Sequence, residues 1–356
     1  MSPSKRIRVL VVDDSAIARR VITESLAPYP EIEVVGTAVD PYDARSQILN
    51  LNPDVITLDV EMPRMDGITF LKLIMQHRPM PVIIMSSLTT QGSEKAMEAL
   101  ECGAVDIVDK PADSCSAHKD GPRLLARIQA PAQAPAITRP APSASSGGKR
   151  RFPARSLILI GASTGGPEAL KKVLSGLEPD LPGIVIVQHI PAQFSRAMAV
   201  RLNSVSRLEV REAVHGDLVK PGTALVAPGG FHTVLHWDGC DYTVELNEGP
   251  PVHHQRPAVD VLFSSAVKAG AGQKSLGLVV TGMGSDGAAG LLELRKAGAL
   301  TVAQDEESSV VYGMPKEAVR LGAAAHVAGI SQMADKINAA FEEMLSSNTS
   351  WHPKAA

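Results

Sequence analysis

The sequence predicts an α/β protein of two doubly wound parallel-sheet domains joined by a flexible linker. Short apolar segments alternate with helical periodicities over residues 7–111, and the same alternation resumes after residue 156. The stretch between them is rich in Ala, Pro, Ser and Gly. A chain of 356 residues is also too long for one ordinary domain and suits two.

The first domain is predicted to hold five strands with helices between them. Because such alternation favours crossover connections, the sheet should be parallel and doubly wound. The predicted strands are 8–12, 32–37, 55–58, 82–85 and 104–108, and the helices are 16–26, 42–49, 67–76 and 93–102, with a short last helix at 124–129.

The linker is predicted at 131–153, where Pro residues give way to a Ser-Ser-Gly-Gly run. We therefore expect domains at 5–130 and 154–345, followed by a polar tail at 346–356. In the second domain, strands are predicted at 157–160, 184–188, 224–227, 277–281 and 300–302, with a hairpin over 233–245 that turns at Asp238-Gly239.

Composition excludes several classes of protein. The net charge of −3 argues against nucleic acid as a partner, because binding to phosphates depends on a basic surface. The three cysteines have neither a disulfide framework nor metal-ligand spacing. Neither a signal peptide nor an apolar run long enough for membrane insertion is recognisable. We therefore expect a cytoplasmic protein.

Polar residues end the strands of the first domain. Asp13 and Asp14 follow the first strand, Asp59 the third, Ser86 the fourth and Lys110 the fifth. Since these ends share one edge of a parallel sheet, three carboxylates would meet there and need a cation. Mg²⁺ suits such oxygen ligands, and Lys110 would compensate a phosphoryl group on Asp59. The alternative is that the aspartates only cap helices or loops.

The first domain resembles response-regulator receivers in the motifs VVDDS, LDVEMPRMDG, MSS and DKP. The resemblance implies a flavodoxin-like fold in which Asp59 accepts a phosphoryl group from a histidine kinase. It also implies that Asp13, Asp14, Asp59 and the carbonyl of Glu61 hold Mg²⁺, and that Ser86 and Lys110 contact the phosphoryl group. Ile107 departs from the family, because many receivers carry a switch aromatic there.

A glycine-rich turn opens the second domain. Ser163 stands within Gly161–Gly166, between an apolar strand and a predicted helix. Such a turn suits an exposed nucleophile, a phosphate-binding loop or simple close packing. By itself the turn leaves these three alternatives open.

Two further strand ends favour the nucleophile. His189 follows the strand at 184–188 and Asp286 follows the strand at 277–281, so both should reach the edge that carries Ser163. A serine needs a histidine to take its proton, and the histidine needs a carboxylate to orient it. Backbone N–H groups of Thr164 and Met283 are candidate donors to an oxyanion.

Other residues compete for these roles. Asp260 and Asp217 are rivals of Asp286, although Asp260 falls within a predicted helix, and Asp286 could merely cap a helix. A metal site at His232 or His253-His254 would need a second pair of ligands, which is not recognisable in the sequence. We therefore expect no cofactor in this domain.

The second domain resembles the protein-glutamate methylesterases of bacterial chemotaxis in GASTGGPEAL, QHIP, HGDLVKPGTALVAPGG, RPAVDVLF and TGMGSDGAAG. The resemblance implies a Rossmann-like serine hydrolase with Ser163 as nucleophile, His189 as base and Asp286 as orienting carboxylate. Its substrates would be γ-methyl esters of glutamate on chemoreceptors, with glutamine deamidation as a second activity. We expect the receiver to restrict the catalytic site until Asp59 is phosphorylated. The alternative is a non-enzymatic regulator whose second domain binds a partner or nucleotide.

Overall fold

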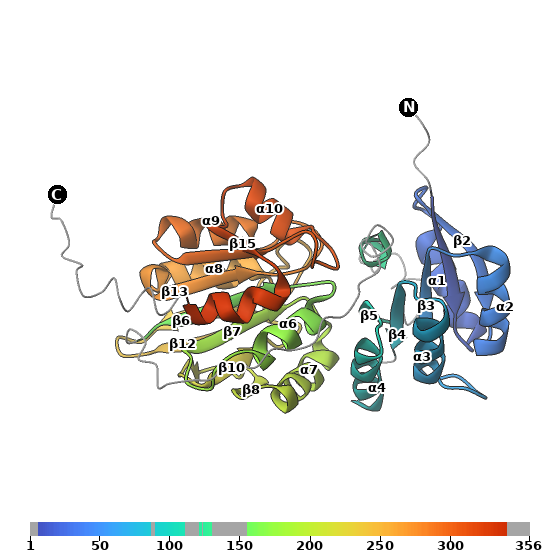
Figure 1. Cartoon of the computed structure of the whole chain (residues 1–356), viewed down its shortest axis with the longest axis horizontal. Helices are drawn as coiled ribbons and strands as arrows, with labels where there is room; N and C mark the ends of the chain where they lie inside the picture. Colours follow the sequence, from blue (N-terminus) through green and yellow to red (C-terminus); the bar gives the residue numbers. More distant parts are fainter. Residues whose placement is uncertain (1–5, 87–89, 111–120, 123, 130–154, 340–356) are drawn as a thin grey trace. The chain divides into compact units, whose positions relative to one another are not determined.

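The computed structural model describes residues 6–86, 90–110, 121–122, 124–129 and 155–339, without the side chains of 90–94 and 101 (Figure 1). The chain divides into two compact units, Met1–Thr138 and Arg139–Ala356, and each is described by itself. The predicted linker at 131–153 and tail at 346–356 lie outside the described residues. Within the described residues, no helix combines the length and apolar character needed to cross a membrane.

The first unit contains the predicted parallel sheet, with strand order β2-β1-β3-β4-β5. Its chain order confirms the alternation of strands and helices. The elements are β1 (Ile7–Val12), α1 (Ala16–Leu26), β2 (Ile32–Ala38), α2 (Pro41–Leu51), β3 (Val55–Asp59), α3 (Gly67–His77), β4 (Val82–Ser86), α4 (Thr90–Glu101) and β5 (Asp106–Asp109).

The core of the first unit forms where the apolar strands meet the amphipathic helices. Val9 and Val11 of β1 pack in one buried cluster with Ile22 of α1 and with Leu124 and Ile128. Residues 124–129 are helical, as predicted. The short last helix therefore covers the sheet beside α1.

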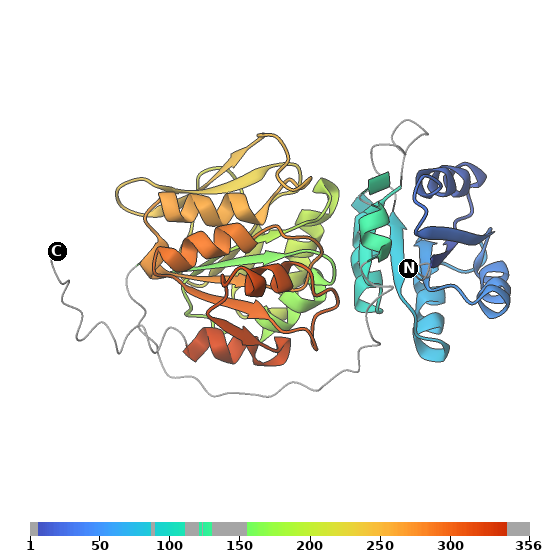
Figure 2. The same cartoon turned by 90° about the horizontal axis from the view of Figure 1, so that it is seen from above.

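The second unit is built on a seven-stranded parallel sheet with the order β15-β14-β13-β6-β7-β10-β8. Helices cover both faces of this sheet (Figure 2). The elements are β6 (Leu157–Ala162), α6 (Gly166–Ser175), β7 (Gly183–Gln188), α7 (Ala192–Val205), β8 (Glu209–Glu212), β10 (Thr223–Val226), α8 (Val259–Lys268), β13 (Ser275–Val279), α9 (Ala288–Lys296), β14 (Leu300–Gln304), α10 (Met314–Arg320) and β15 (His326–Ala328).

The predicted hairpin is confirmed as β11 (His232–Trp237) and β12 (Tyr242–Asn247), joined by a four-residue turn, Asp238–Asp241, that contains the predicted Asp238-Gly239. The two-residue β9 (Asp217–Leu218) adds to it antiparallel and completes a three-stranded sheet. Leu235, Tyr242 and Val244 of the hairpin are buried in one cluster with residues of α8. The hairpin therefore braces the helix whose start lies beside the candidate site.

The order of the strands selects the place for a site. The chain runs from β6 to β7 on one side of β6, and later returns to place β13 on its other side. All these pairs are parallel, so their carboxyl ends lie at one edge. In open α/β sheets ligands bind where the strand order reverses. The carboxyl end of β6, which leads into Ser163, is that place.

Candidate active site

The predicted acidic cluster forms at the strand ends of the first unit. Asp13 and Asp59 are buried, and Lys110 Nζ lies 2.9 Å from Asp13 Oδ2 and 2.6 Å from Asp59 Oδ2. Asp14 is exposed, and ligand atoms of the three aspartates lie within 4.8 Å of one another. Three carboxylates at this spacing form a set of hard oxygen ligands that fits Mg²⁺.

Burial governs the charges in this cluster. It raises the pKa of Asp59 above its ordinary value, with the Asp13 charge adding to the rise and Lys110 opposing it. Burial alone would lower the pKa of Lys110, but its contacts with Asp59 and Asp13 raise it instead. The three carboxylates therefore carry more negative charge than Lys110 alone can neutralise, as expected of a cation site.

The other predicted residues of this edge also lie close by. Ser86 is buried, and its carbonyl accepts a hydrogen bond from the N–H of Lys110 at 3.0 Å. The Glu61 N–H donates to Asp59 Oδ1 at 3.1 Å, while the Glu61 side chain pairs with Lys95. Ile107 is buried in β5.

Backbone geometry shapes the turn that carries Ser163 in the second unit. Gly165 has a φ of 76°, a backbone conformation that favours glycine, and it directly precedes the first residue of α6. A Cβ on Gly166 would come within 1.9 Å of Gln188 Oε1, so only glycine fits there. The Ser163 N–H donates to the carbonyl of Thr281 at 3.1 Å, which ties the turn to the segment after β13.

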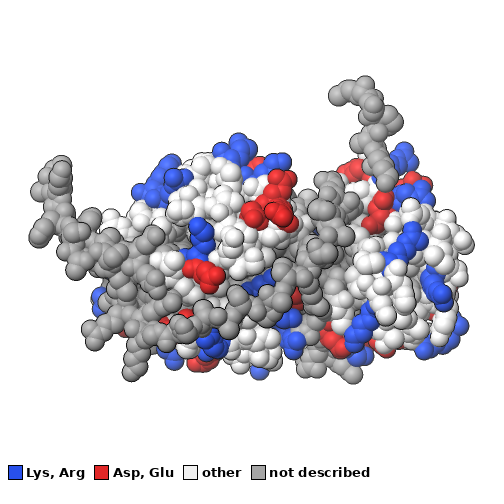
Figure 3. Space-filling view, viewed as in Figure 1, with Lys and Arg blue, Asp and Glu red and all other residues white. Residues whose placement is uncertain are grey.

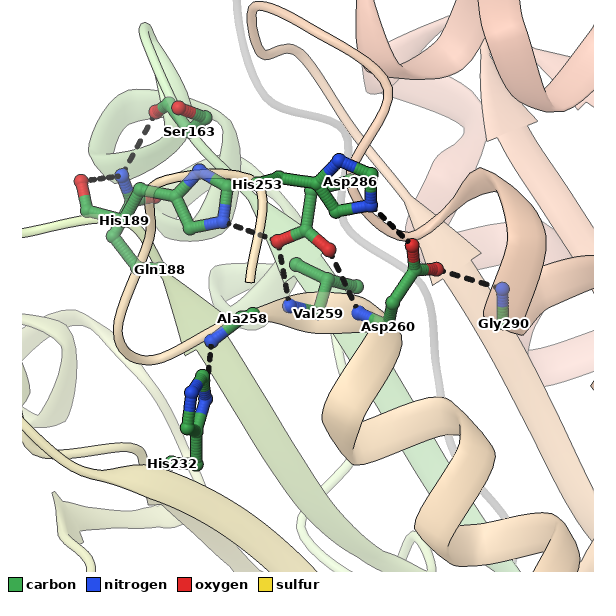
Figure 4. A network of polar contacts seen from close by, with 10 residues as sticks. All are labelled: Ser163, Gln188, His189, His232, His253, Ala258, Val259, Asp260, Asp286 and Gly290. Atoms are coloured by element: carbon green, nitrogen blue, oxygen red, sulfur yellow. Dashed lines mark hydrogen bonds and ion pairs between the residues drawn. The ribbon is translucent and has the colours of Figure 1, made fainter. Parts of the chain in front are cut away.

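Gln188 was not predicted, yet it joins two of the predicted residues. Its side-chain amide donates to the Ser163 carbonyl at 2.8 Å and to the His189 carbonyl at 3.2 Å (Figure 4). It is the last residue of β7 and is buried. The signal in the sequence was a glutamine that directly follows the apolar run 184–187, because an amide at the end of a buried strand needs hydrogen-bond partners.

His189 and Asp286 meet as predicted. His189 Nε2 lies 2.7 Å from Asp286 Oδ2, and both side chains are buried (Figure 4). The His189 N–H donates to the Ala162 carbonyl, the residue before Ser163, at 3.0 Å. Neighbouring strands therefore hold the serine and the histidine side by side, and the loop after β13 brings the carboxylate.

Asp286 also caps a helix, which is the role suggested as its alternative. Its Oδ2 accepts the Val259 N–H at 2.7 Å and its Oδ1 accepts the Asp260 N–H at 2.9 Å, both in the first turn of α8. Burial alone would raise the pKa of Asp286, but the bond to His189 and these N–H groups lower it. The bond to His189 and the start of α8 together thus favour the ionised form of Asp286.

The rival carboxylates have other partners. Asp217 pairs with Arg211 and accepts the Val214 N–H. Asp260 contacts His253 Nε2 at 2.9 Å and accepts the Gly290 N–H at 2.7 Å. Only Asp286, of the three, bonds His189 among the contacts described.

The histidines considered for a metal make local contacts. His232 accepts the Ala258 N–H at Nδ1 and lies 3.0 Å from the Pro250 carbonyl at Nε2, so the network assigns its proton to Nε2. His253 pairs with Asp260, and His254 follows it with φ of 60°. Hydrogen bonds therefore account for both ring nitrogens of His232 and for Nε2 of His253.

The predicted oxyanion donors flank the serine. Thr164 is buried, and its carbonyl accepts the Thr281 hydroxyl at 3.0 Å. Met283 follows Gly282, at which a Cβ would come within 2.7 Å of Ser163 Cβ. The segment before Met283 is thus packed directly against the serine. The role of both N–H groups stays a prediction.

Comparison with known proteins gives two family matches. Residues 158–337 match the CheB methylesterase family, and residues 9–120 match the response regulator receiver domain family. A Syntrophus aciditrophicus protein named protein-glutamate methylesterase/protein-glutamine glutaminase 2 is 52% identical, covering 93% of this chain and 98% of its own. A Bordetella avium protein of the same name is 50% identical over 94% of this chain and 97% of its own.

A solved structure shares the fold of the second unit. The crystal structure of the Thermotoga maritima CheB methylesterase catalytic domain is 36% identical, with a TM-score of 0.51. The match covers 52% of this chain and 97% of that domain.

Proposed function

The chain belongs to the CheB methylesterase family, and we propose that it hydrolyses γ-methyl esters of glutamate on chemoreceptors and deamidates receptor glutamines. Its receiver unit makes it a phosphorylation-regulated enzyme. The observation that carries the proposal is the 2.7 Å contact between His189 and Asp286, which follow β7 and β13, the two strands on either side of β6. This arrangement gives an acyl-transfer site its base and its orienting carboxylate.

Acylation would begin at Ser163. Its Oγ attacks the ester carbonyl as its proton moves to His189. Because Asp286 holds Nε2, the nitrogen that takes this proton is Nδ1. The tetrahedral intermediate then collapses, the ester C–O bond breaks, and methanol leaves with the proton from His189.

Deacylation would return the enzyme to its starting state. A water molecule gives a proton to His189, its oxygen attacks the acyl carbonyl, and Ser163 leaves with that proton. The product is a glutamate side chain. With glutamine as substrate, ammonia leaves in place of methanol, and the later step is the same.

Two kinds of group would stabilise the charges that develop. The N–H groups of Thr164 and Met283 would donate to the oxyanion, and loss of one such donor costs roughly 10² to 10³ in rate. Asp286, whose pKa is lowered by its bond to His189 and by the N–H groups at the start of α8, stabilises the His189 imidazolium. Neither role requires a metal or an organic cofactor in this unit.

The receiver unit would supply the regulation. Asp59 accepts the phosphoryl group from a chemotaxis histidine kinase, while Ser86 and Lys110 contact its oxygens. Asp13, Asp14, Asp59 and the Glu61 carbonyl would hold Mg²⁺, which when bound neutralises charge on the transferring phosphoryl group. The ion pairs of Lys110 with Asp13 and Asp59 support this assignment.

The partners follow from this chemistry. The substrates are methylated chemoreceptor helices, and the cytoplasm is where kinase and receptor sites meet the enzyme. On the face seen in Figure 3, the described Lys and Arg residues occur in separate small groups among Asp and Glu. This pattern does not favour nucleic acid as a partner.

A fluorophosphonate probe tests the hydrolase against a non-enzymatic regulator. We expect covalent labelling of the full chain at Ser163, because a serine beside its base attacks phosphorus as it attacks carbon. Labelling should vanish in Ser163→Ala and persist in Ser204→Ala, which alters an exposed serine. An unreactive Ser163 together with tight nucleotide binding would support the regulator instead.

A further inference from the structure

Two carboxylates tie the starts of neighbouring helices to each other. Asp286, just before α9, accepts the N–H groups of Val259 and Asp260 at the start of α8. Asp260, in that first turn of α8, accepts the Gly290 N–H in the first turn of α9. Figure 4 shows the two carboxylates side by side in this network. The start of α8 is thus held by Asp286, and the start of α9 is held by Asp260.

These bonds replace ordinary caps. Ala258 and Gly287 precede the two helices, and neither makes a side-chain capping bond. The first N–H groups of a helix have no partner within the helix, so the carboxylates satisfy donors that otherwise lack one. The result is a closed ring of contacts through Asp286, Gly290 and Asp260. A shift of Asp260 therefore moves the carboxylate that orients His189.

The ring reaches solvent through His253. Its Nε2 lies 2.9 Å from Asp260 Oδ2, and its side chain is 43% exposed against 13% for Asp260. His253 sits in a tight turn closed by two backbone bonds between Val252 and Gln255. Its φ of 51° is rare for residues other than glycine. A half-exposed imidazole is thus held against a partly buried carboxylate.

This path places two neighbouring carboxylates, Asp260 and Asp286, between the imidazoles of His253 and His189. The titratable groups that face Asp260 are His253 from the 252–255 turn and Asp286 from the loop before α9, with His189 beyond Asp286. From α9, the contact described is the uncharged Gly290 N–H. Burial raises the pKa of Asp260, the Asp286 charge adds to the rise, and the Gly290 and His253 bonds oppose it. Charge on His253 therefore reaches the site through Asp260.

We propose that Asp260 is a positioning residue for Asp286, and that the His253–Asp260 pair sets the pH range in which His189 can act as base. This inference rests on the proposed hydrolase function. Asp260 holds the carboxylate in place and adds a negative charge near the imidazolium. Protonated His253 offsets that charge from the solvent side.

The test is the pH profile of kcat/KM for methanol release from a glutamate γ-methyl ester peptide by the full chain. Its acidic limb reports the protonation of His189 in the free enzyme. Asp260→Asn and His253→Gln each remove one charge but keep a polar group of similar shape. Asn can still accept the Gly290 N–H, and Gln can still donate to Asp260.

We expect the acidic limb of the pH profile to move in opposite directions in the two variants. Asp260→Asn removes a negative charge, so the imidazolium loses support and the limb moves to lower pH by about half a unit. His253→Gln removes the positive charge that His253 carries when protonated, and moves the limb to higher pH by a similar amount, about half a unit. Asp260→Asn should also lower kcat about tenfold with little change in KM, because the carboxylate is less well placed.

His236→Gln is the matched control, since His236 faces Glu245 at 3.8 Å on the exposed hairpin. We expect the acidic limb of this control variant to stay where it is in the unchanged protein. An acidic limb that does not move in Asp260→Asn and His253→Gln, or that moves in the same direction in both, would overturn the proposal. If Ser163→Ala still releases methanol at the normal rate, the proposed function itself fails, which is a separate result.

Discussion

At the scale of residues, the site depends on side chains that serve two purposes. Asp286 orients His189 and also holds the first turn of α8. Gln188 ties the carbonyls of Ser163 and His189 together. Such residues place the proposed catalytic groups by the same bonds that hold the fold, so the geometry of the site is fixed before substrate binds.

Asp286→Asn tests the orienting carboxylate. The neutral amide can stabilise the wrong tautomer of His189 and leaves the imidazolium without its countercharge, so kcat should fall by roughly 10³ to 10⁴. Methanol-release kinetics on methylated receptor would measure this. Asp217→Asn is the control, because Asp217 pairs with Arg211 instead. A larger loss in the control would show that the wrong carboxylate is assigned.

At the scale of elements, parallel strands explain why residues far apart in sequence meet. β1, β3 and β5 bring Asp13, Asp59 and Lys110 to one edge, and β6 and β7 do the same for Ser163 and His189. These meetings could be predicted, because long apolar runs mark buried strands and polar residues mark their ends. The sheet order therefore accounts for why most of the predicted site residues lie close together.

Other parts could not be predicted from local patterns. β8 was not predicted because Glu209–Glu212 contains three charged residues and one buried valine, a composition found in edge strands. β15 was missed because it has three residues. The double role of Asp286 depends on the start of α8, which precedes it by a whole strand and helix. Only the tertiary structure brings those groups together.

The strand ends of the receiver predict a dependence of stability on pH. Burial raises the pKa of Asp59, so the native state holds this proton more tightly than the unfolded state, and stability falls as pH rises through that pKa. Without Mg²⁺, Asp59→Asn should therefore raise the free energy of unfolding at neutral pH by on the order of 1 kcal/mol.

That gain should shrink as pH falls through the raised pKa toward the ordinary value of 3.8, because Asp59 then becomes neutral too. Calorimetry of the full chain at several pH values would measure it. Asp14→Asn, at an exposed position on the same edge, should change stability much less. A destabilised Asp59→Asn protein at neutral pH would contradict the account.

At the scale of the whole molecule, the chain combines a unit that stores a signal as charge with a unit that cleaves an ester. Under the proposed function, a phosphoryl group would add nearly two negative charges at Asp59. The two units have separate cores and separate sites. The proposed regulation therefore requires that the charge at Asp59 change the rate at Ser163.

The most direct measurement is methanol release from methylated receptor by the full chain, with and without a small phosphodonor and Mg²⁺. We predict that the donor raises the rate of the unchanged protein, that Asp59→Asn shows no response to it, and that Ser163→Ala releases no methanol under either condition. Normal turnover by Ser163→Ala, or full activation of Asp59→Asn, would contradict the central claim that Ser163 is the nucleophile and Asp59 its switch.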